Sequence, residues 1–236
     1  MKPSVVKSSL ILLLFWAVGI QTGCSQAERS SEIVRQAPGA AKTQPPVAPK
    51  VEQAQHVIVA LGNSLTAGLG VARKQSYPSI LEQRLQEEGY PYRVINMGVS
   101  GDTTAGGLRR VDQLLGSKPD IVIIELGAND GLRGLDLNQS RQNLAQMIEC
   151  FQAAGVKVVL AGMKLPPNYG EDYASRFERI YPELAVRYQV VLIPFFLEGV
   201  ATRVDLNQAD GIHPTAQGYS VVVKNLMPVL KSLLLK

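Results

Sequence analysis

The sequence predicts a three-layer α/β domain with a parallel β-sheet over residues 56–236. Five short apolar runs alternate with longer amphipathic segments, which is typical of βαβ units. The runs are continuously apolar rather than alternating, so each strand is expected to be covered on both faces. Hydrophobic residues make up 46% of the chain and charged residues 19%, a globular composition that can bury a core.

The expected strands and helices follow one another in strict alternation. The strands are predicted at residues 57–61, 92–97, 120–126, 156–162 and 189–195. The helices are predicted at residues 76–89, 104–116, 138–154, 172–188 and 214–234. No internal repeat of fixed period is visible, so residues 56–236 are expected to form one domain.

The first 23 residues have the pattern of an export signal. Lys2 and Lys7 precede an 11-residue apolar stretch, "LILLLFWAVGI", that is too short to span a membrane comfortably. The following "QTGC" places Cys24 at the expected cleavage point and resembles a bacterial lipobox, although Gln21 stands where leucine is usual. The pattern favours a lipoprotein whose anchor is Cys24, with ordinary secretion and a free Cys24 as the alternative.

Residues 24–55 are expected to be a proline-rich linker, since "APGAAKTQPPVAPK" has four prolines in 14 residues. An exported chain with a lipidated Cys24 would be periplasmic or held at a membrane surface. Ser25 is not the aspartate associated with inner-membrane retention, which favours the outer membrane. For Cys150, a buried and inert thiol is expected, while a disulfide with Cys24 is the alternative.

The charge balance excludes one class of partner. Residues 1–23 contain two lysines and no acid, so the remainder carries 22 basic and 20 acidic residues, a net charge of +2. No dense cluster of lysine and arginine is present, so nucleic-acid binding is not expected.

Polar residues that could carry chemistry follow the predicted strands. Functional groups of open parallel sheets gather beyond the carboxyl ends of the strands. The residues at four of these ends are Ser64, Gly101, Asn129 and His213.

A serine nucleophile needs a base, and the chain has two histidines. His56 precedes the first strand and is expected at the opposite edge of the sheet from Ser64. His213 follows the last strand, and Asp210 stands three residues before it, where a carboxylate could orient the imidazole. Alternatively, Asp210 and Gly211 form only a turn, and Pro214 opens the last helix.

Two residues could stabilise an oxyanion. Gly101 could offer a backbone N–H from a glycine-rich loop, and Asn129 a side-chain amide. Asn129 lies in "GANDG", which also fits an ordinary Asx turn. The spacing of histidine and carboxylates matches no metal site, and no phosphate-binding glycine motif is present, so no cofactor is expected.

The order of these residues resembles the SGNH, or GDSL-type, hydrolase family. The motifs that carry the resemblance are "GNSLTAG", "VSGDT", "GAND" and "DGIHP", which together span the domain. With "ELGANDGLRG" and "LPPNYG", the chain is most similar to the bacterial branch of periplasmic acyl-CoA thioesterases, lysophospholipases and arylesterases. The resemblance implies a flavodoxin-like fold with five parallel strands. Asn63 is a departure, because the family usually has aspartate there.

The resemblance also implies roles. Ser64 would be the nucleophile, His213 the general base and then acid, and Asp210 the residue that orients His213. The oxyanion hole would consist of the Ser64 and Gly101 N–H groups and the Asn129 side chain. The segment 131–136 would be a mobile loop beside the site.

The expected activity is that of a serine esterase or thioesterase. Apolar residues near the site could form an acyl-binding groove, or they could simply close the edge of the core; they are Leu132, Leu135, Leu165, Pro166, Pro167 and Tyr169. A carbohydrate O-deacetylase with a small acetyl pocket is an alternative. A non-catalytic envelope lipoprotein is another, although every catalytic position is occupied.

Overall fold

A computed structural model describes residues 56–235 of the chain. The expected signal (1–23), the expected linker (24–55) and Cys24 lie outside the described residues. Between residues 56 and 235, no helix is both long enough and apolar enough to span a membrane.

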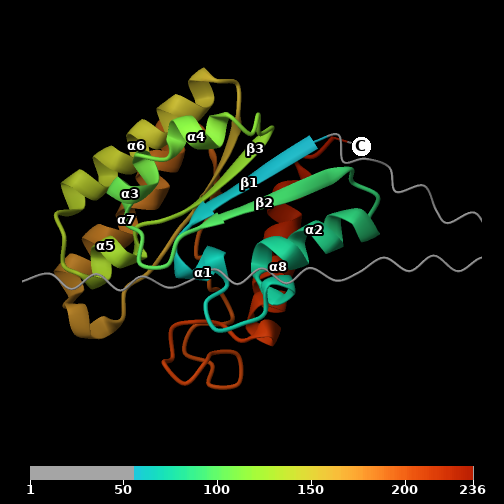
Figure 1. The fold of residues 1–236 in the computed structure, drawn as a ribbon. Helices are drawn as coiled ribbons and strands as arrows, with labels where there is room; N and C mark the ends of the chain where they lie inside the picture. The colour runs from blue at the N-terminus through green and yellow to red at the C-terminus, as the bar shows by residue number, and fades with distance from the viewer. Residues whose placement is uncertain (1–55, 236) are drawn as a thin grey trace, which may run out of the picture. The chain divides into compact units, whose positions relative to one another are not determined.

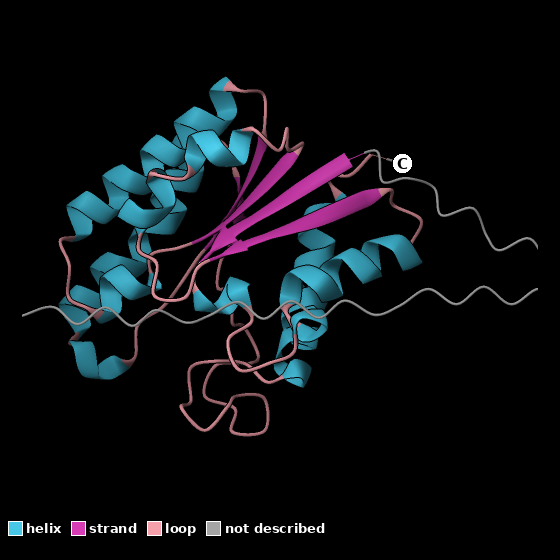
Figure 2. Cartoon of the chain, in the orientation of Figure 1, coloured by secondary structure: helices cyan, strands magenta, loops and turns pink. Residues whose placement is uncertain are grey.

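Five parallel strands form one sheet in the order β2-β1-β3-β4-β5, as Figures 1 and 2 show. The strands are β1 (His56–Gly62), β2 (Tyr92–Gly98), β3 (Ile121–Glu125), β4 (Lys157–Ala161) and β5 (Val191–Ile193). The predicted parallel α/β fold is therefore confirmed. β5 is shorter than the expected 189–195, because it is followed by Pro194, which lacks the N–H that a strand donates.

Helices cover both faces of the sheet (Figure 1). On one side lie α2 (Tyr77–Glu87) and α8 (Ala216–Lys231), which contact each other. On the other lie α3 (Thr104–Leu108), α4 (Val111–Leu115), α6 (Leu137–Ala153) and α7 (Glu171–Tyr188). The expected helix 104–116 is thus two short helices. They are separated at Arg110, whose guanidinium reaches back to Met97 O (2.8 Å) and to the Asp102 carboxylate (2.5 Å).

Two one-turn helices were not predicted from the sequence. They are α1 (Ser64–Ala67) and α5 (Ala128–Leu132), and they follow β1 and β3 directly. Each carries a candidate site residue, because Ser64 begins α1 and Asn129 lies in α5. The two helices therefore present side chains at the carboxyl edge of the sheet, where β1 and β2 end beside α1 (Figure 1).

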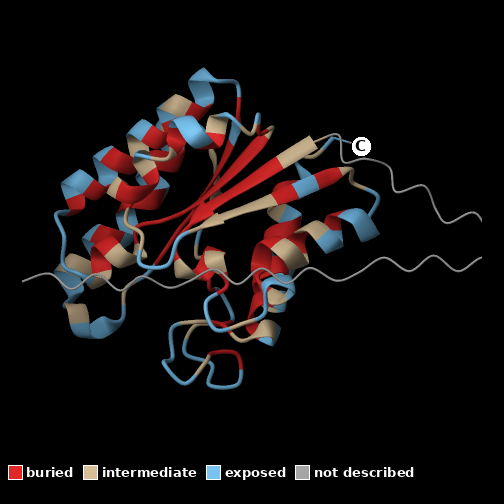
Figure 3. Ribbon diagram, in the orientation of Figure 1, coloured by how far each residue is buried: buried red, intermediate tan, exposed pale blue. Residues whose placement is uncertain are grey.

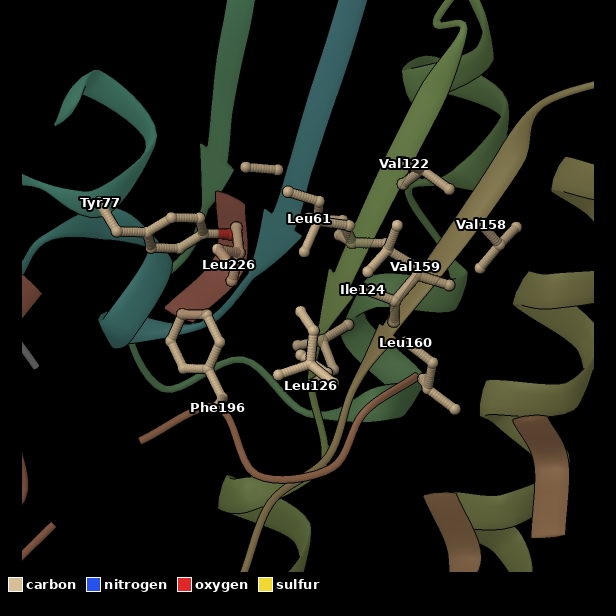
Figure 4. Close-up of a cluster of buried hydrophobic side chains, with 14 of the residues drawn as sticks. Leu61, Tyr77, Val122, Ile124, Leu126, Val158, Val159, Leu160, Phe196 and Leu226 are labelled. Carbon is tan, nitrogen blue, oxygen red and sulfur yellow. The ribbon is translucent and has the colours of Figure 1, made fainter. Parts of the chain in front are cut away.

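The strands form the centre of the hydrophobic core. Every residue of β3 is buried, and Ile58 to Leu61 of β1 are fully inaccessible to solvent (Figure 3). Figure 4 shows side chains from β1, β3 and β4 packed together with Tyr77 of α2, Leu226 of α8 and Phe196 of the loop that follows β5. The continuous apolar runs are thus covered on both faces, as predicted, and the strands form a rigid frame for the loops at their ends.

Cys150 differs from its prediction. Its thiol is free and only partly buried, rather than buried. The reason is its position on α6, between exposed Glu149 and fully buried Phe151, where the helix surface turns from the core toward solvent.

Candidate active site

The turn between β1 and α1 fixes the position of Ser64. Asn63 is almost fully buried and caps α1, with its side-chain Oδ1 accepting from the N–H of Leu65 at 2.9 Å. Gly62 allows a close approach, since a Cβ there would lie 1.9 Å from Thr66 Oγ1. Gly98 of β2 approaches α1 as closely, because its Cβ would lie 2.1 Å from Ala67 N. The hydroxyl of Ser64 is therefore presented on a closely packed turn.

Ser64, His213 and Asp210 are brought together from opposite ends of the domain. Ser64 Oγ lies 2.8 Å from His213 Nε2, and His213 Nδ1 lies 2.7 Å from Asp210 Oδ2. Asp210 Oδ1 accepts from the N–H groups of Ile212 and His213, each at 3.0 Å. These backbone donors, Ile212 foremost, and the imidazole lower the pKa of Asp210 to about 2. The carboxylate is thus ionised at neutral pH and oriented toward the imidazole.

The segment after His213 differs from the alternative in which Asp210 and Gly211 form only a turn and Pro214 opens the last helix. Pro214 does not begin that helix. Thr215 caps α8 instead, and its side chain accepts from Gly218 N at 3.2 Å, so the helix begins at Ala216. Pro214 pairs with Asn207 in an isolated antiparallel bridge, and Gln208 N–H donates to His213 O at 2.8 Å. These contacts hold the histidine loop against the body of the domain.

Asn129 lies in α5 and Gly101 in the loop that follows β2, and hydrogen bonds join these two segments. Asn129 Nδ2 donates to Asp102 O at 2.9 Å, which leaves a second amide proton for another acceptor. Gly101 has φ +81°, a conformation that other residues rarely adopt, and its carbonyl accepts from Arg133 Nη2 at 2.8 Å. Asn129 lines the same cavity as Ser64 and His213, whereas Gly101 does not.

A largely apolar cavity of about 370 Å³ opens beside Ser64 and His213. Four of the six predicted groove residues line it: Leu132, Leu165, Pro166 and Pro167. Leu135 and Tyr169 do not line it. Leu135 is 43% exposed, and the Tyr169 hydroxyl donates to Leu132 O at 3.0 Å, which joins the tyrosine to the 131–136 segment. The cavity also has lining residues that sequence reasoning missed, among them Leu65, Met163, Phe195, Leu197, Ala201 and Ile212.

Sequence reasoning missed Glu125, the last residue of β3. Its carboxylate is fully buried and accepts from Asn63 Nδ2 (2.9 Å), Asn63 N (3.3 Å) and Thr66 Oγ1 (2.8 Å). Burial raises the pKa of Glu125 to about 7 although these donors act in the opposite direction. The one signal in the sequence is a glutamate inside the apolar run "DIVIIEL", which gives no indication of its partners.

Asp130, the neighbour of Asn129, was also missed. It is buried and accepts from Thr104 N (2.9 Å), Thr104 Oγ1 (2.6 Å) and Ser140 Oγ (3.1 Å). These bonds tie α5 to the start of α3 and to α6, so they fix the helix that carries Asn129.

His56 lies at the far end of β1, as expected. Its Nδ1 is 3.2 Å from Asp120 Oδ1, and its ring stacks on Tyr92 with centroids 5.0 Å apart. Within residues 56–235, no group of three or more histidine, cysteine, aspartate or glutamate side chains is arranged to hold a metal ion.

A serine, a histidine and an ionised aspartate in hydrogen-bonded series, at the carboxyl edge of a parallel sheet and beside an apolar cavity, define a serine hydrolase. A sequence profile of the GDSL-like Lipase/Acylhydrolase family matches residues 60–221. The chain belongs to this family, as its motifs predicted.

Several known proteins are similar to this chain. Esterase TesA of Pseudomonas aeruginosa is 46% identical over 78% of this chain and 92% of its own length. An arylesterase of Vibrio mimicus is 47% identical, over 69% and 82%. The thioesterase 1/protease 1/lysophospholipase L1 of Escherichia coli K12 is 37% identical, over 75% and 86%.

Solved structures agree with the fold. A crystal structure of TesA, 46% identical, superposes with a TM-score of 0.73 over 75% of this chain and 99% of its own. The psychrotrophic esterase EstA of Pseudoalteromonas sp., 32% identical and described as inhibited by monoethylphosphonate, gives a TM-score of 0.72 over 75% and 97%.

Proposed function

We propose that this serine esterase cleaves acyl esters or thioesters through an acyl-enzyme formed on Ser64. The named activities of its relatives are esterase, arylesterase and thioesterase or lysophospholipase, which support hydrolysis of small-molecule carboxylic esters. The observation that carries the proposal is the 2.8 Å contact between Ser64 Oγ and His213 Nε2 at the wall of an apolar cavity.

In the acylation step, Ser64 Oγ attacks the carbonyl carbon while His213 Nε2 takes the hydroxyl proton. The carbonyl oxygen becomes an oxyanion, for which the N–H groups of Ser64 and Gly101 and the amide of Asn129 are the proposed donors. When the tetrahedral intermediate collapses, the protonated imidazole gives its proton to the leaving alcohol or thiol. The acyl group remains on Ser64.

In the deacylation step, His213 takes a proton from water, and the water oxygen attacks the acyl carbon. The collapse of the second intermediate returns the proton to Ser64 Oγ and releases the carboxylic acid. Asp210 acts throughout by holding the imidazole with Nε2 toward Ser64. Its low pKa, about 2, supports this role because it stays anionic as the imidazolium forms.

The apolar cavity favours substrates whose acyl chain is longer than acetyl. Each methylene that leaves water contributes about 0.8 kcal/mol, so kcat/KM should rise along a series of p-nitrophenyl esters until the cavity is filled. Leu165→Ala should reduce the advantage of longer chains while leaving p-nitrophenyl acetate turnover nearly unchanged. A maximum at acetate would support the O-deacetylase alternative instead.

Labelling with a fluorophosphonate tests the proposal directly. The wild-type protein should gain one adduct, and peptide mapping should place it on Ser64. Ser64→Ala should fold normally and gain none. A folded wild-type protein that gains no adduct would indicate a non-catalytic role.

The export of the chain and its attachment through Cys24 also remain proposals, supported by the charged and apolar pattern of residues 1–23 and by the "QTGC" motif. A lipid on Cys24 would hold the esterase domain at a membrane through the linker. Cys24→Ser should move the protein from the detergent phase to the aqueous phase and leave esterase activity intact. Unchanged partitioning would contradict the anchor.

A further inference from the structure

Lys164 places a charge in the wall of the largely apolar cavity. Within residues 56–235, it is the only lysine, arginine, aspartate or glutamate that lines the cavity. Its neighbours along the chain, Met163 and Leu165, line the same cavity and are apolar. An ammonium group against apolar surface loses part of its hydration, which is unfavourable unless other groups replace the water. The lysine therefore needs partners at this position.

Two contacts hold the Lys164 ammonium. Its Nζ lies 3.0 Å from Oε1 of Glu178, on α7, and 5.3 Å from the centre of the Phe195 ring, which attracts a cation. Phe195 lines the cavity, whereas Glu178 does not, so the carboxylate neutralises the ammonium from outside the cavity. An ammonium has three N–H donors, and after the bond to Glu178 two remain for other acceptors.

The ion pair is not a structural requirement of the fold. The side chains of Lys164 and Glu178 are 45% and 50% exposed, and pairs this open to water contribute little to stability. Replacement of either residue is therefore expected to leave the domain folded. What the pair changes is the chemistry of the cavity wall, where it sets a hydrogen-bond donor among apolar side chains.

Lys164 lies away from the nucleophile along the groove. Ser64 follows β1 and Lys164 follows β4, and in the sheet β3 lies between these two strands. Neighbouring strands are about 4.8 Å apart, so the ends of β1 and β4 are separated by about 10 Å. An acyl chain that is bound to Ser64 and extends across the carboxyl edge of the sheet meets the ammonium only after several methylenes. An acetyl group does not reach it.

We propose that Lys164 is a specificity-determining residue that binds the far end of the acyl group, and that the enzyme prefers acyl groups ending there in a hydroxyl over plain alkyl chains of equal length. The inference rests on the proposed function, because it takes Ser64 as the nucleophile and the cavity as the acyl site. A hydroxyl oxygen accepts from a free N–H of the ammonium. A terminal methyl group would displace water from the ammonium without replacing its hydrogen bonds.

The charge balance favours a neutral hydroxyl over a carboxylate at the end of the acyl chain. Glu178 already supplies one negative charge to the Lys164 ammonium, and a carboxylate would bring a second one to the same cation. A hydroxyl accepts a hydrogen bond without adding charge. Removal of the charge of Glu178 should therefore shift the preference toward acyl groups that end in a carboxylate.

The experiment measures kcat/KM for p-nitrophenyl esters from butanoyl to dodecanoyl, each paired with the ester in which a hydroxyl replaces the terminal methyl group. Within a pair, the ratio of the hydroxyl ester to the methyl ester cancels differences in overall turnover. Short pairs should favour the methyl ester, because an unpaired hydroxyl in an apolar cavity is unfavourable. In the wild type, the ratio should rise by about tenfold or more at the length that reaches Lys164.

Three variants test the groups involved. Lys164→Met keeps a long side chain and removes the ammonium, so the rise should be absent and the methyl ester favoured at every length. Glu178→Gln keeps an oxygen acceptor for the ammonium without its charge, and should raise kcat/KM by about tenfold for esters whose acyl chain ends in a carboxylate. Lys157→Met is the matched control and should keep the wild-type ratios, because Lys157 Nζ donates to Leu233 O at the amino end of β4.

A wild-type ratio that does not rise with chain length would overturn the proposal, and this result does not depend on how any variant folds. A rise that persists in Lys164→Met would also overturn it and would assign the hydroxyl to another polar residue of the cavity wall, Thr202. An unchanged response of Glu178→Gln to the carboxylate esters would overturn the preference for a neutral group. Turnover of p-nitrophenyl acetate by the wild type reports separately on Ser64, and its absence would contradict the proposed function rather than the role of Lys164.

Discussion

The domain contains two histidine–aspartate pairs at opposite ends of its sheet. His56 and Asp120 lie at the amino edge, and His213 and Asp210 at the carboxyl edge. Both aspartates are held by backbone N–H groups, Asp120 by that of Val57 at 2.7 Å and Asp210 by those of Ile212 and His213. The pairs differ in what the histidine meets next, because His213 faces Ser64 Oγ whereas His56 stacks on Tyr92.

The difference shows that a histidine–aspartate pair does not by itself make a base for catalysis. At the amino edge of the sheet the strands begin, and His56 contacts the ring of Tyr92 and the carboxylate of Asp120. At the carboxyl edge the loops that follow the strands converge, and a turn serine can meet a histidine 149 positions away in the chain.

The largest effect is expected at Ser64 and His213. Ser64→Ala and His213→Ala should each lower kcat by on the order of 10⁶-fold, with little change in stability, because hydroxyl and imidazole act as one unit. The double variant should be barely worse than either single variant. Losses that add in the logarithm of the rate, measured by steady-state kinetics, would contradict that coupling.

Asp210→Asn should lower kcat by on the order of 10⁴-fold, less than the loss of Ser64, because nucleophile and oxyanion donors survive. Asp120→Asn, the same change at the other pair, should leave kcat within about twofold of wild type because that pair touches no reacting atom. Equal losses at the two positions would remove the distinction between the pairs.

The pH dependence of stability should separate Glu125 from Asp210. The folded-state pKa of Glu125, about 7, is above its ordinary value of 4.5, so its stabilising effect is complete below pH 4.5 and is lost as the pH rises through 7. A shift of this size corresponds to roughly 3 kcal/mol. Asp210 has a lowered pKa, so its contribution is present above its ordinary pKa of 3.8 and is lost as the pH falls toward 2.

Chemical denaturation of wild type and Glu125→Gln between pH 4 and 8 provides the measurement. As the pH rises from 4.5 to 7, the free energy of unfolding of the wild type should fall relative to that of Glu125→Gln. A difference that is constant with pH would mean that Glu125 does not titrate in this range.

The smallest effect is expected at His56. His56→Ala should lower the free energy of unfolding by about 1 kcal/mol, through loss of the ring stacking on Tyr92 and of the bond to Asp120. Turnover should not change. A loss of activity without a loss of stability would place the amino edge of the sheet in the catalytic mechanism.

The sequence was sufficient to predict the sheet and to place Ser64 and His213 at one edge of it, whereas the role of Asp210 was implied by the resemblance to the SGNH family. Apolar runs identify strands covered on both faces, and the carboxyl ends of parallel strands lie at one edge, so residues far apart in the chain could be placed together. The helices α1 and α5 were not predicted because one helical turn is too short to show a period.

Side-chain partners depend on tertiary contacts that no local pattern records. A glutamate in an apolar run gives no sign that it will meet Asn63 and Thr66, so the bonds of Glu125 could not be predicted. For the same reason, the sequence could not show that Leu135 and Tyr169 do not line the cavity, although both lie near site residues in the sequence. The tyrosine hydroxyl donates to the carbonyl of Leu132, and Leu135 is exposed to solvent.

The rate at which a fluorophosphonate modifies Ser64 tests most directly the claim that His213, and not His56, activates the nucleophile. Wild type and His56→Ala should gain one adduct on Ser64 at equal rates, as measured by intact mass and peptide mapping, whereas His213→Ala should gain essentially none. An adduct on another residue, or a His213→Ala protein that reacts as fast as wild type, would contradict the account.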